Sequence, residues 1–279
     1  MRAVYEQPAL ARQDGLWMLN NKRWGRIGGV NGHGYNLTIG KDFLSDEHGY
    51  YGLLFDYGSN TVSGAAGSGE YDSYSLGLYA GNKNKPGSIT GFVSYGLQAN
   101  KGTAYLPVLG QTAESGYDSK TLGIGVEYAY DLDYGKPEEL WHVSPYARIN
   151  FTHYRQKAFR EHGAGVFDRS FGSYSDNYAE GELGLSFDRS EGTGGYGIRL
   201  GYKRILTGER QLMEVCFAED ECGSLLPVRS WGEGRNHFVA AAYVRHDFSR
   251  KWSAGGSLSG DWSNGGREIG ARLDLAYHF

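Results

Sequence analysis

The last fourteen residues of this 279-residue chain, GREIGARLDLAYHF, alternate between two kinds of side chain at every second position. One face carries Ile269, Ala271, Leu273, Leu275, Tyr277 and Phe279, and the other carries Glu268, Gly270, Arg272, Asp274, Ala276 and His278. A period of two belongs to a β-strand, whereas an amphipathic helix repeats its apolar positions every three or four residues. The chain therefore needs a sheet with one apolar face and one wet face.

The same alternation recurs along most of the chain, between clusters of Gly, Asn, Asp and Ser. We predict about twelve antiparallel strands, at residues 15–29, 34–44, 50–62, 71–82, 88–100, 117–132, 141–155, 176–189, 194–206, 235–249, 251–263 and 266–279. The pattern is blurred in two of them. The first segment also fits a short helix, and Phe238 to Val244 is apolar on both faces.

Composition fits strands better than helices, since the 22 Tyr and 12 Phe favour strands and the 44 Gly disfavour helices. Its richest apolar run, Phe238 to Val244, is far shorter than the roughly 20 residues that a membrane helix needs. A barrel strand exposes only alternate residues to lipid, so it can cross a membrane with a low average hydropathy. A net charge of −4 gives no reason to expect nucleic acid as a partner.

The connections between the predicted strands alternate in length. Short turns follow every second strand, whereas long polar segments are expected at residues 58–73, 101–118, 155–176 and 207–234. Short turns at one rim and long loops at the other are typical of outer-membrane barrels, and an even number of strands puts both termini at the short-turn rim. Tyr and Trp near predicted strand ends, such as Tyr50, Trp252 and Tyr277, fit membrane interfaces. The sequence thus predicts an all-β transmembrane antiparallel barrel.

Several short motifs accompany this architecture: Trp24-Gly25-Arg26 near the start, Leu-Gly-Leu at residues 76–78 and 183–185, Leu-Gly-Ile at residues 122–124, and the terminal ARLDLAYHF. Together they resemble the C-terminal translocator domain of bacterial autotransporters (type V secretion), over nearly the whole chain. The resemblance implies a monomeric barrel of the bacterial outer membrane that anchors an N-terminal passenger polypeptide and helps export it. It also implies the lipid bilayer and the barrel-assembly machinery as partners.

The resemblance further implies two functional segments. Residues 1–14 would be a linker or plug that enters the lumen ahead of a barrel at residues 15–279. Residues 1–14 contain no apolar core of a signal peptide, so we expect that Met1 is not the natural start. An assembly signal at the lipid-facing end of the last strand would comprise Leu273, Leu275, Tyr277 and Phe279.

Charged residues fall on the faces that alternation turns inward. The residues expected to line the lumen are Glu127, Asp131, Arg148, Glu180, Glu182, Arg199, Lys203, Arg272 and Asp274. Their signs are mixed, which favours luminal ion pairs in a hydrated wall over a channel selective for one sign of charge. A twelve-stranded porin or solute channel remains the alternative interpretation.

Catalytic motifs are weak. Gly192 to Gly197 matches a dinucleotide-binding pattern, but it precedes a strand, whereas phosphate binding needs a helix there. His142 with Ser144, and His153 with Asp168, are the nearest candidates for a hydrolase, the third interpretation. A chance polar pair in the lumen explains them better, so we expect no enzyme, cofactor or metal centre.

Cys216 and Cys222 lie in the longest predicted loop. An extracytoplasmic location favours a disulfide between them. Metal binding by the two cysteines with Glu219, Asp220 or Glu221 lacks the usual ligand spacing.

Overall fold

The computed structural model describes residues 15–45, 49–82, 86–134, 141–208, 212–217, 226–229 and 234–279. Within these ranges, twelve long strands form a closed antiparallel β-barrel. They are β1 (Gly15–Ile27), β2 (Val30–Ser45), β3 (Gly49–Gly64), β4 (Gly67–Asn82), β5 (Gly87–Leu106), β6 (Gln111–Tyr130), β8 (Trp141–Gln156), β11 (Tyr174–Glu191), β12 (Gly194–Thr207), β15 (Asn236–Asp247), β16 (Trp252–Ser263) and β17 (Gly266–His278).

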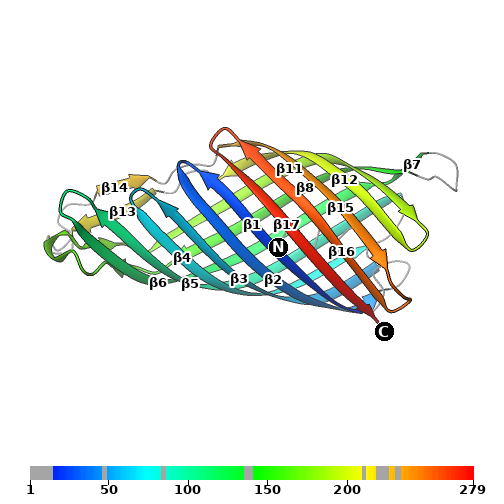
Figure 1. Ribbon diagram of the computed structural model, residues 1–279, viewed down its shortest axis with the longest axis horizontal. Coiled ribbons are helices and arrows are strands. Elements are labelled where there is room, and N and C mark those ends of the chain that lie inside the picture. The colour runs from blue at the N-terminus through cyan, green and yellow to red at the C-terminus, as the bar shows by residue number, and fades with distance from the viewer. Residues whose placement is uncertain are drawn as a thin grey trace.

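Each long strand pairs with the next one in the chain, and β17 closes the barrel on β1. The closing register joins Gly15 to His278 and Ile27 to Gly266. Figure 1 shows the slanted strands around the cylinder, with β1 beside β17. Closure leaves no unpaired edge among these twelve strands, which removes the usual route by which sheets aggregate. All twelve predicted strands are confirmed, and the first segment is a strand, not a helix.

The two ends of the barrel differ. β1 begins and β17 ends at one rim, which we call the terminal rim; it also carries the tight connection from β15 to β16. The opposite end, the loop rim, carries a four-stranded sheet of β9 (Phe159–Arg160), β10 (Arg169–Phe171), β13 (Leu212–Phe217) and β14 (Leu226–Arg229). In Figure 1, β13 and β14 lie at the end opposite to the C-terminus.

The prediction of long polar loops at residues 58–73 and 101–118 is wrong. Residues 58–73 are mostly strand, because β3 and β4 continue to a tight turn at Ala65 and Ala66. Residues 101–118 behave likewise, because β5 and β6 pair as far as Leu106 and Gln111. Strands of 20 residues rise about 50 Å along a tilted barrel wall, well beyond a hydrocarbon core of about 30 Å. The β5–β6 hairpin therefore projects past the membrane as part of the loop rim.

The other two long connections remain. Residues between β8 and β11 include a short 3-10 helix, η3 (Gly165–Phe167), as well as β9 and β10. The backbone N–H groups of Glu114 and His162 each donate to the other's carbonyl, which ties this connection to β6. Phe159 stacks on both Tyr117 and Phe171, with ring centroids 4.2 and 4.4 Å apart. The four-stranded sheet is thus joined to the barrel wall.

A last short strand, β7 (Leu132–Tyr134), continues the line of β6 along β8 after a break at Asp131. Among the residues that the structure describes, no helix is long and apolar enough to cross a membrane.

Candidate functional site: the barrel lumen

Burial alternates along each barrel strand, so the inner and outer faces can be read directly. In β17, Leu273 is 71% exposed on the outer face, whereas Arg272 and Asp274 are buried on the inner face. The outer face of the other strands is also apolar and exposed, for example at Leu76, Ile124 and Leu258. An exposed apolar belt around the whole barrel suits contact with lipid.

The centre of the charged lumen is Glu127 on β6. Its Oε2 atom lies 2.7 Å from Nη2 of Arg148 on β8 and 2.5 Å from Nη2 of Arg199 on β12. Arg148 also approaches Glu182 of β11, with Nη1 and Oε2 3.6 Å apart. The charges of four strands therefore meet inside the barrel. Pairing of this kind is needed because a buried charge without a partner is costly.

Tyr146 of β8 organises the same cluster. Its hydroxyl donates a hydrogen bond of 2.7 Å to Oε1 of Glu182, and the guanidinium of Arg199 lies 3.5 Å from its ring centroid. The ring lies across Gly184 and Gly201, where an added Cβ would collide with it. Glycine on two adjacent strands thus lets the ring lie flat against the wall, beneath Arg199.

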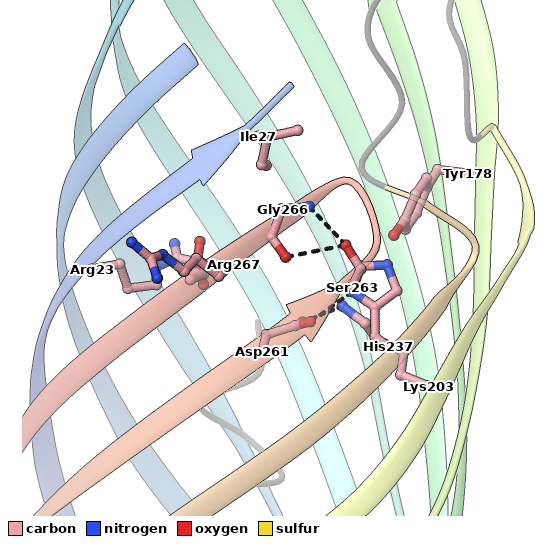
Figure 2. Close-up of a pocket in the computed structure, with 10 residues that line it drawn as sticks. Arg23, Ile27, Tyr178, Lys203, His237, Asp261, Ser263, Gly266 and Arg267 are labelled. Carbon is pink, nitrogen blue, oxygen red and sulfur yellow. Dashed lines mark hydrogen bonds and ion pairs between the residues drawn. The ribbon is translucent and has the colours of Figure 1, made fainter. Parts of the chain in front are cut away.

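A second cluster lies toward the loop rim and lines a cavity of about 180 Å³ (Figure 2). Asp261 of β16 accepts from Nζ of Lys203 at 2.5 Å and lies 2.6 Å from Nδ1 of His237. The other ring nitrogen of His237 lies 3.1 Å from the carbonyl oxygen of Gly234. Lys203 also lies 3.8 Å from Glu180, whose carboxylate accepts from Tyr178. These contacts hold the start of β15, where the chain comes back from the long β12–β15 connection, against the barrel wall.

A third group lines a cavity of about 460 Å³ that also contains Glu127 and Arg199. Asp131 accepts a hydrogen bond of 2.8 Å from Ser144, and Asp188 accepts one of 2.7 Å from Ser186. Arg272 also lines this cavity, and its Nε atom lies 3.5 Å from Oδ1 of Asp274. The structure therefore brings the nine predicted luminal residues into three groups that contain both acidic and basic side chains.

A fourth group near the terminal rim was not predicted. Trp17, Leu19, Tyr50, Leu54, Tyr79, Phe92 and Ala276 form one buried apolar cluster on the inner face. The indole of Trp17 donates to the hydroxyl of Tyr79, which donates in turn to Asp42. The assignment of Tyr50 to a membrane interface is wrong, because its side chain points inward and its hydroxyl lies 2.5 Å from that of Thr90. Alternation in β3 (GYYGLLFD) already places Tyr50 opposite Tyr51, which is the signal that could have identified it.

The residues of the predicted assembly signal all lie on the outer face. Leu273, Leu275 and Phe279 are exposed, and the rings of Tyr277 and Phe279 meet edge to face at 5.4 Å. This position fits contact with lipid, and the role in assembly stays a prediction.

Three members of the candidate catalytic pairs have other hydrogen-bond partners in the structure, namely Ser144, His153 and Asp168. Ser144 donates to Asp131, and His142 pairs in register with Asp188 across β8 and β11. His153 contacts Asn177 through Nδ1, whereas Asp168 accepts from the backbone of Ala164. No group of three His, Cys, Asp or Glu side chains in the described part of the chain is placed to hold a metal ion.

Cys216 is buried in β13, within the four-stranded sheet. Cys222, Glu219, Asp220 and Glu221 lie outside the described residues, as do residues 1–14. The predicted disulfide therefore stays a prediction.

A closed barrel with an apolar outer belt and a charged, ion-paired interior defines a transmembrane β-barrel of the outer-membrane type. A family model described as the autotransporter beta-domain matches residues 16–259. The chain therefore belongs to the autotransporter β-domain family, and its location is the bacterial outer membrane. No curated protein sequence matches it.

Solved translocator domains share the fold. The translocator domain of the autotransporter NalP from Neisseria meningitidis matches with a TM-score of 0.79 and 18% identity, covering 100% of this chain and 93% of that one. The β-domain of the Bordetella autotransporter BrkA matches at 0.68 and 14%, over 96% and 100%. The transport unit of AIDA-I from Escherichia coli matches at 0.67 and 12%, over 98% and 93%.

Proposed function

We propose that this outer-membrane translocator barrel anchors a passenger polypeptide, joined N-terminally to it, and helps to export that passenger to the cell surface. The observation that carries the proposal is the ion-paired lumen of a barrel in the autotransporter β-domain family. A wall that carries charges of both signs holds water and can exchange hydrogen bonds with a passing backbone, which an apolar wall cannot do. We assign no reaction to the barrel.

The path of the chain supports this proposal. β1 enters the wall at the terminal rim, beside the end of β17. With the loop rim outside the cell, as in outer-membrane barrels generally, the terminal rim faces the periplasm. A passenger that is joined ahead of β1 and displayed outside must then be connected through the lumen. Residues 1–14 would be the linker or plug of that connection, and residues 15–279 the barrel.

The remaining partners follow from the same architecture. The barrel-assembly machinery would insert the chain, since its lipid-facing belt cannot fold in water. The barrel would act as a monomer, because closure of β17 on β1 leaves the barrel strands no free edge for a second copy.

Export can be tested with a reporter. A small epitope-tagged domain, placed between a signal peptide and Met1, should become accessible to antibody and protease on intact cells. A matched fusion would carry the same reporter ahead of an unrelated closed barrel of similar size, and its reporter should stay inaccessible. A folded barrel whose reporter remains in the periplasm would contradict the proposal and favour the solute channel.

Conductance tests the plug separately. In planar bilayers, a barrel of residues 15–279 should conduct more than the full chain, because a segment in the lumen displaces water and ions. Equal and large conductances for both would argue against a plug in residues 1–14, and would also favour the solute channel.

A further inference from the structure

Two lysines flank the aromatic end of β17 on the lipid-facing side of the terminal rim. Lys41 lies on β2 and Lys251 lies just ahead of β16, and both are exposed. Strands β2, β1, β17 and β16 are consecutive neighbours in the barrel, so the lysines stand on either side of Tyr277 and Phe279. This row of four side chains forms no part of the lumen.

Lys41 is held between two rings. Its Nζ atom lies 5.6 Å from the ring centroid of Phe43 on its own strand and 5.6 Å from that of Phe279. A cation over an aromatic face is attracted to the ring's electrons, and two rings restrict it more than one. The ammonium of Lys41 is therefore kept beside the last residue of the chain.

Lys251 is held in the same way from the other side. Its Nζ atom lies 5.8 Å from the ring centroid of Tyr277 and 3.5 Å from the hydroxyl of that tyrosine. Trp252 packs on the same ring at a centroid distance of 4.8 Å, and Tyr277 contacts Phe279 at 5.4 Å. The two ammonium groups and the aromatic side chains between them thus form one continuous surface.

Neither lysine forms an ion pair with an acidic side chain of the described residues, whereas Arg23, Arg148, Arg199 and Lys203 all do. Aromatic belts lie at the depth of the lipid headgroups, and lysine side chains extend toward that depth. Anionic groups at this depth would complete the contacts of each lysine. The phosphate of a glycerophospholipid is the anion that a bilayer supplies there.

We infer that Lys41 and Lys251, with Tyr277 and Phe279 between them, bind phosphate headgroups of anionic phospholipids in the leaflet at the terminal rim. The surface beside the row favours a lipid over a soluble anion. Leu16, Leu273 and Leu275 are exposed on the same face and would lie along the acyl chains. This inference concerns only the outer surface, so it does not depend on export of a passenger.

Native mass spectrometry of the full chain can test the site. The protein is released from detergent that contains equal amounts of phosphatidylglycerol and phosphatidylcholine, and the lipids that stay bound are counted. Wild type should retain phosphatidylglycerol preferentially. The double variant Lys41→Gln/Lys251→Gln should lose about fivefold in phosphatidylglycerol affinity for each lysine removed, with little change for phosphatidylcholine.

A second double variant serves as the matched control. Lys22→Gln/Lys101→Gln removes the same charge at places nearer the loop rim, where Lys22 lies over Trp24 and Lys101 pairs with Glu70. It should keep the phosphatidylglycerol preference, and heat-modifiable gel mobility shows that each variant is folded. Equal retention of the two lipids by wild type, or equal losses in both double variants, would overturn the inference. So would displacement of the lipid by millimolar inorganic phosphate, since that would indicate a site for free anions.

Discussion

The indole N–H of Trp17 donates a hydrogen bond of 2.9 Å to the hydroxyl of Tyr79, and so joins β1 to β4 across the inside of the barrel. The two strands are separated in the wall by β2 and β3, so the contact is made through the lumen. Both side chains are almost fully buried, and their ring centroids lie 5.9 Å apart. The bond therefore braces the wall near the terminal rim.

Tyr79→Phe should destabilise the folded barrel. The change removes the acceptor of Trp17 and the donor to Asp42, and a buried donor without a partner costs about 1–3 kcal/mol. Urea unfolding in lipid vesicles, followed by tryptophan fluorescence, measures the loss. Tyr57→Phe is the control, since the hydroxyl of Tyr57 makes only an exposed 3.4 Å bond to Asp72. Equal urea midpoints for both variants would show that the Trp17–Tyr79 hydrogen bond contributes nothing to the stability of the barrel.

Glu127→Ala should have a larger effect. The carboxylate of Glu127 is shared by Arg148 and Arg199, and the side chain of Arg148 is only 2% exposed. Removing one partner of a buried ion pair costs about 3–5 kcal/mol, because the other charge remains in a poorly solvated place. Glu191→Ala breaks the pair with Arg189, in which the side chain of Glu191 is 55% exposed, and should cost about 1 kcal/mol or less. The same unfolding assay compares the two variants. Similar losses in the free energy of unfolding would mean that the charges around Glu127 are well hydrated.

Ile124→Arg should impair assembly in the membrane. Ile124 lies on the outer face of β6, and an arginine facing lipid costs about 2–4 kcal/mol at the bilayer midplane. Asn150→Arg adds the same side chain to the inner face of β8, beside the carboxylate of Glu180. Folded barrel in outer-membrane fractions should fall for the first variant and stay near wild type for the second. The reverse order would mean that the faces are assigned wrongly.

Deleting Phe279 should lower the yield of folded barrel in cells. Phe279 is 73% exposed and packs on Tyr277 at the lipid-facing end of β17, where resembling barrels carry an assembly signal. Phe248→Ala removes a comparably exposed ring, 68% exposed, from the turn at the same rim. Only the deletion should reduce heat-modifiable barrel in membranes. Purified chains refolded into detergent should behave alike, because the proposed signal acts through the assembly machinery.

The strands could be predicted because successive residues of each strand face lipid and the wet lumen in turn. In β6, Leu122, Ile124 and Val126 alternate with Gly123, Gly125 and Glu127, so both the strand and its facing follow from sequence. The signal disappears beyond the membrane. Residues 101–106 of β5 and 111–116 of β6 carry many small and polar side chains, so their sequence resembles a polar loop although they are paired strands.

The luminal contacts were harder to predict than the faces. Glu127 and Arg199 are 72 residues apart, and they meet because three strand registers and the curvature of the barrel bring β6 and β12 together. Alternation places each charge inside the barrel, but it does not say which charges meet. The aromatic cluster at Trp17 was missed for a related reason, since an inward tryptophan has the same local pattern as a lipid-facing one.

Gly40→Ala tests how the aromatic cluster is supported. Gly40 pairs with Trp17 across β1 and β2, and a Cβ at Gly40 would collide with the indole carbons Cζ2, Cε2 and Cη2. The indole must therefore lift away from the wall, which breaks its bond to Tyr79. Crowding of this kind typically costs about 1–3 kcal/mol, in addition to the lost hydrogen bond.

Two measurements isolate that effect. The indole N–H resonance of Trp17 should shift in NMR spectra of Gly40→Ala, but not in those of Gly172→Ala, where an added Cβ meets nothing within 4 Å. In a double-mutant cycle, Gly40→Ala should cost less in the Tyr79→Phe background than in wild type, because the Trp17–Tyr79 bond is already absent there. Strictly additive losses would show that Gly40→Ala does not act through the Trp17–Tyr79 hydrogen bond. That result would count against the brace across the lumen.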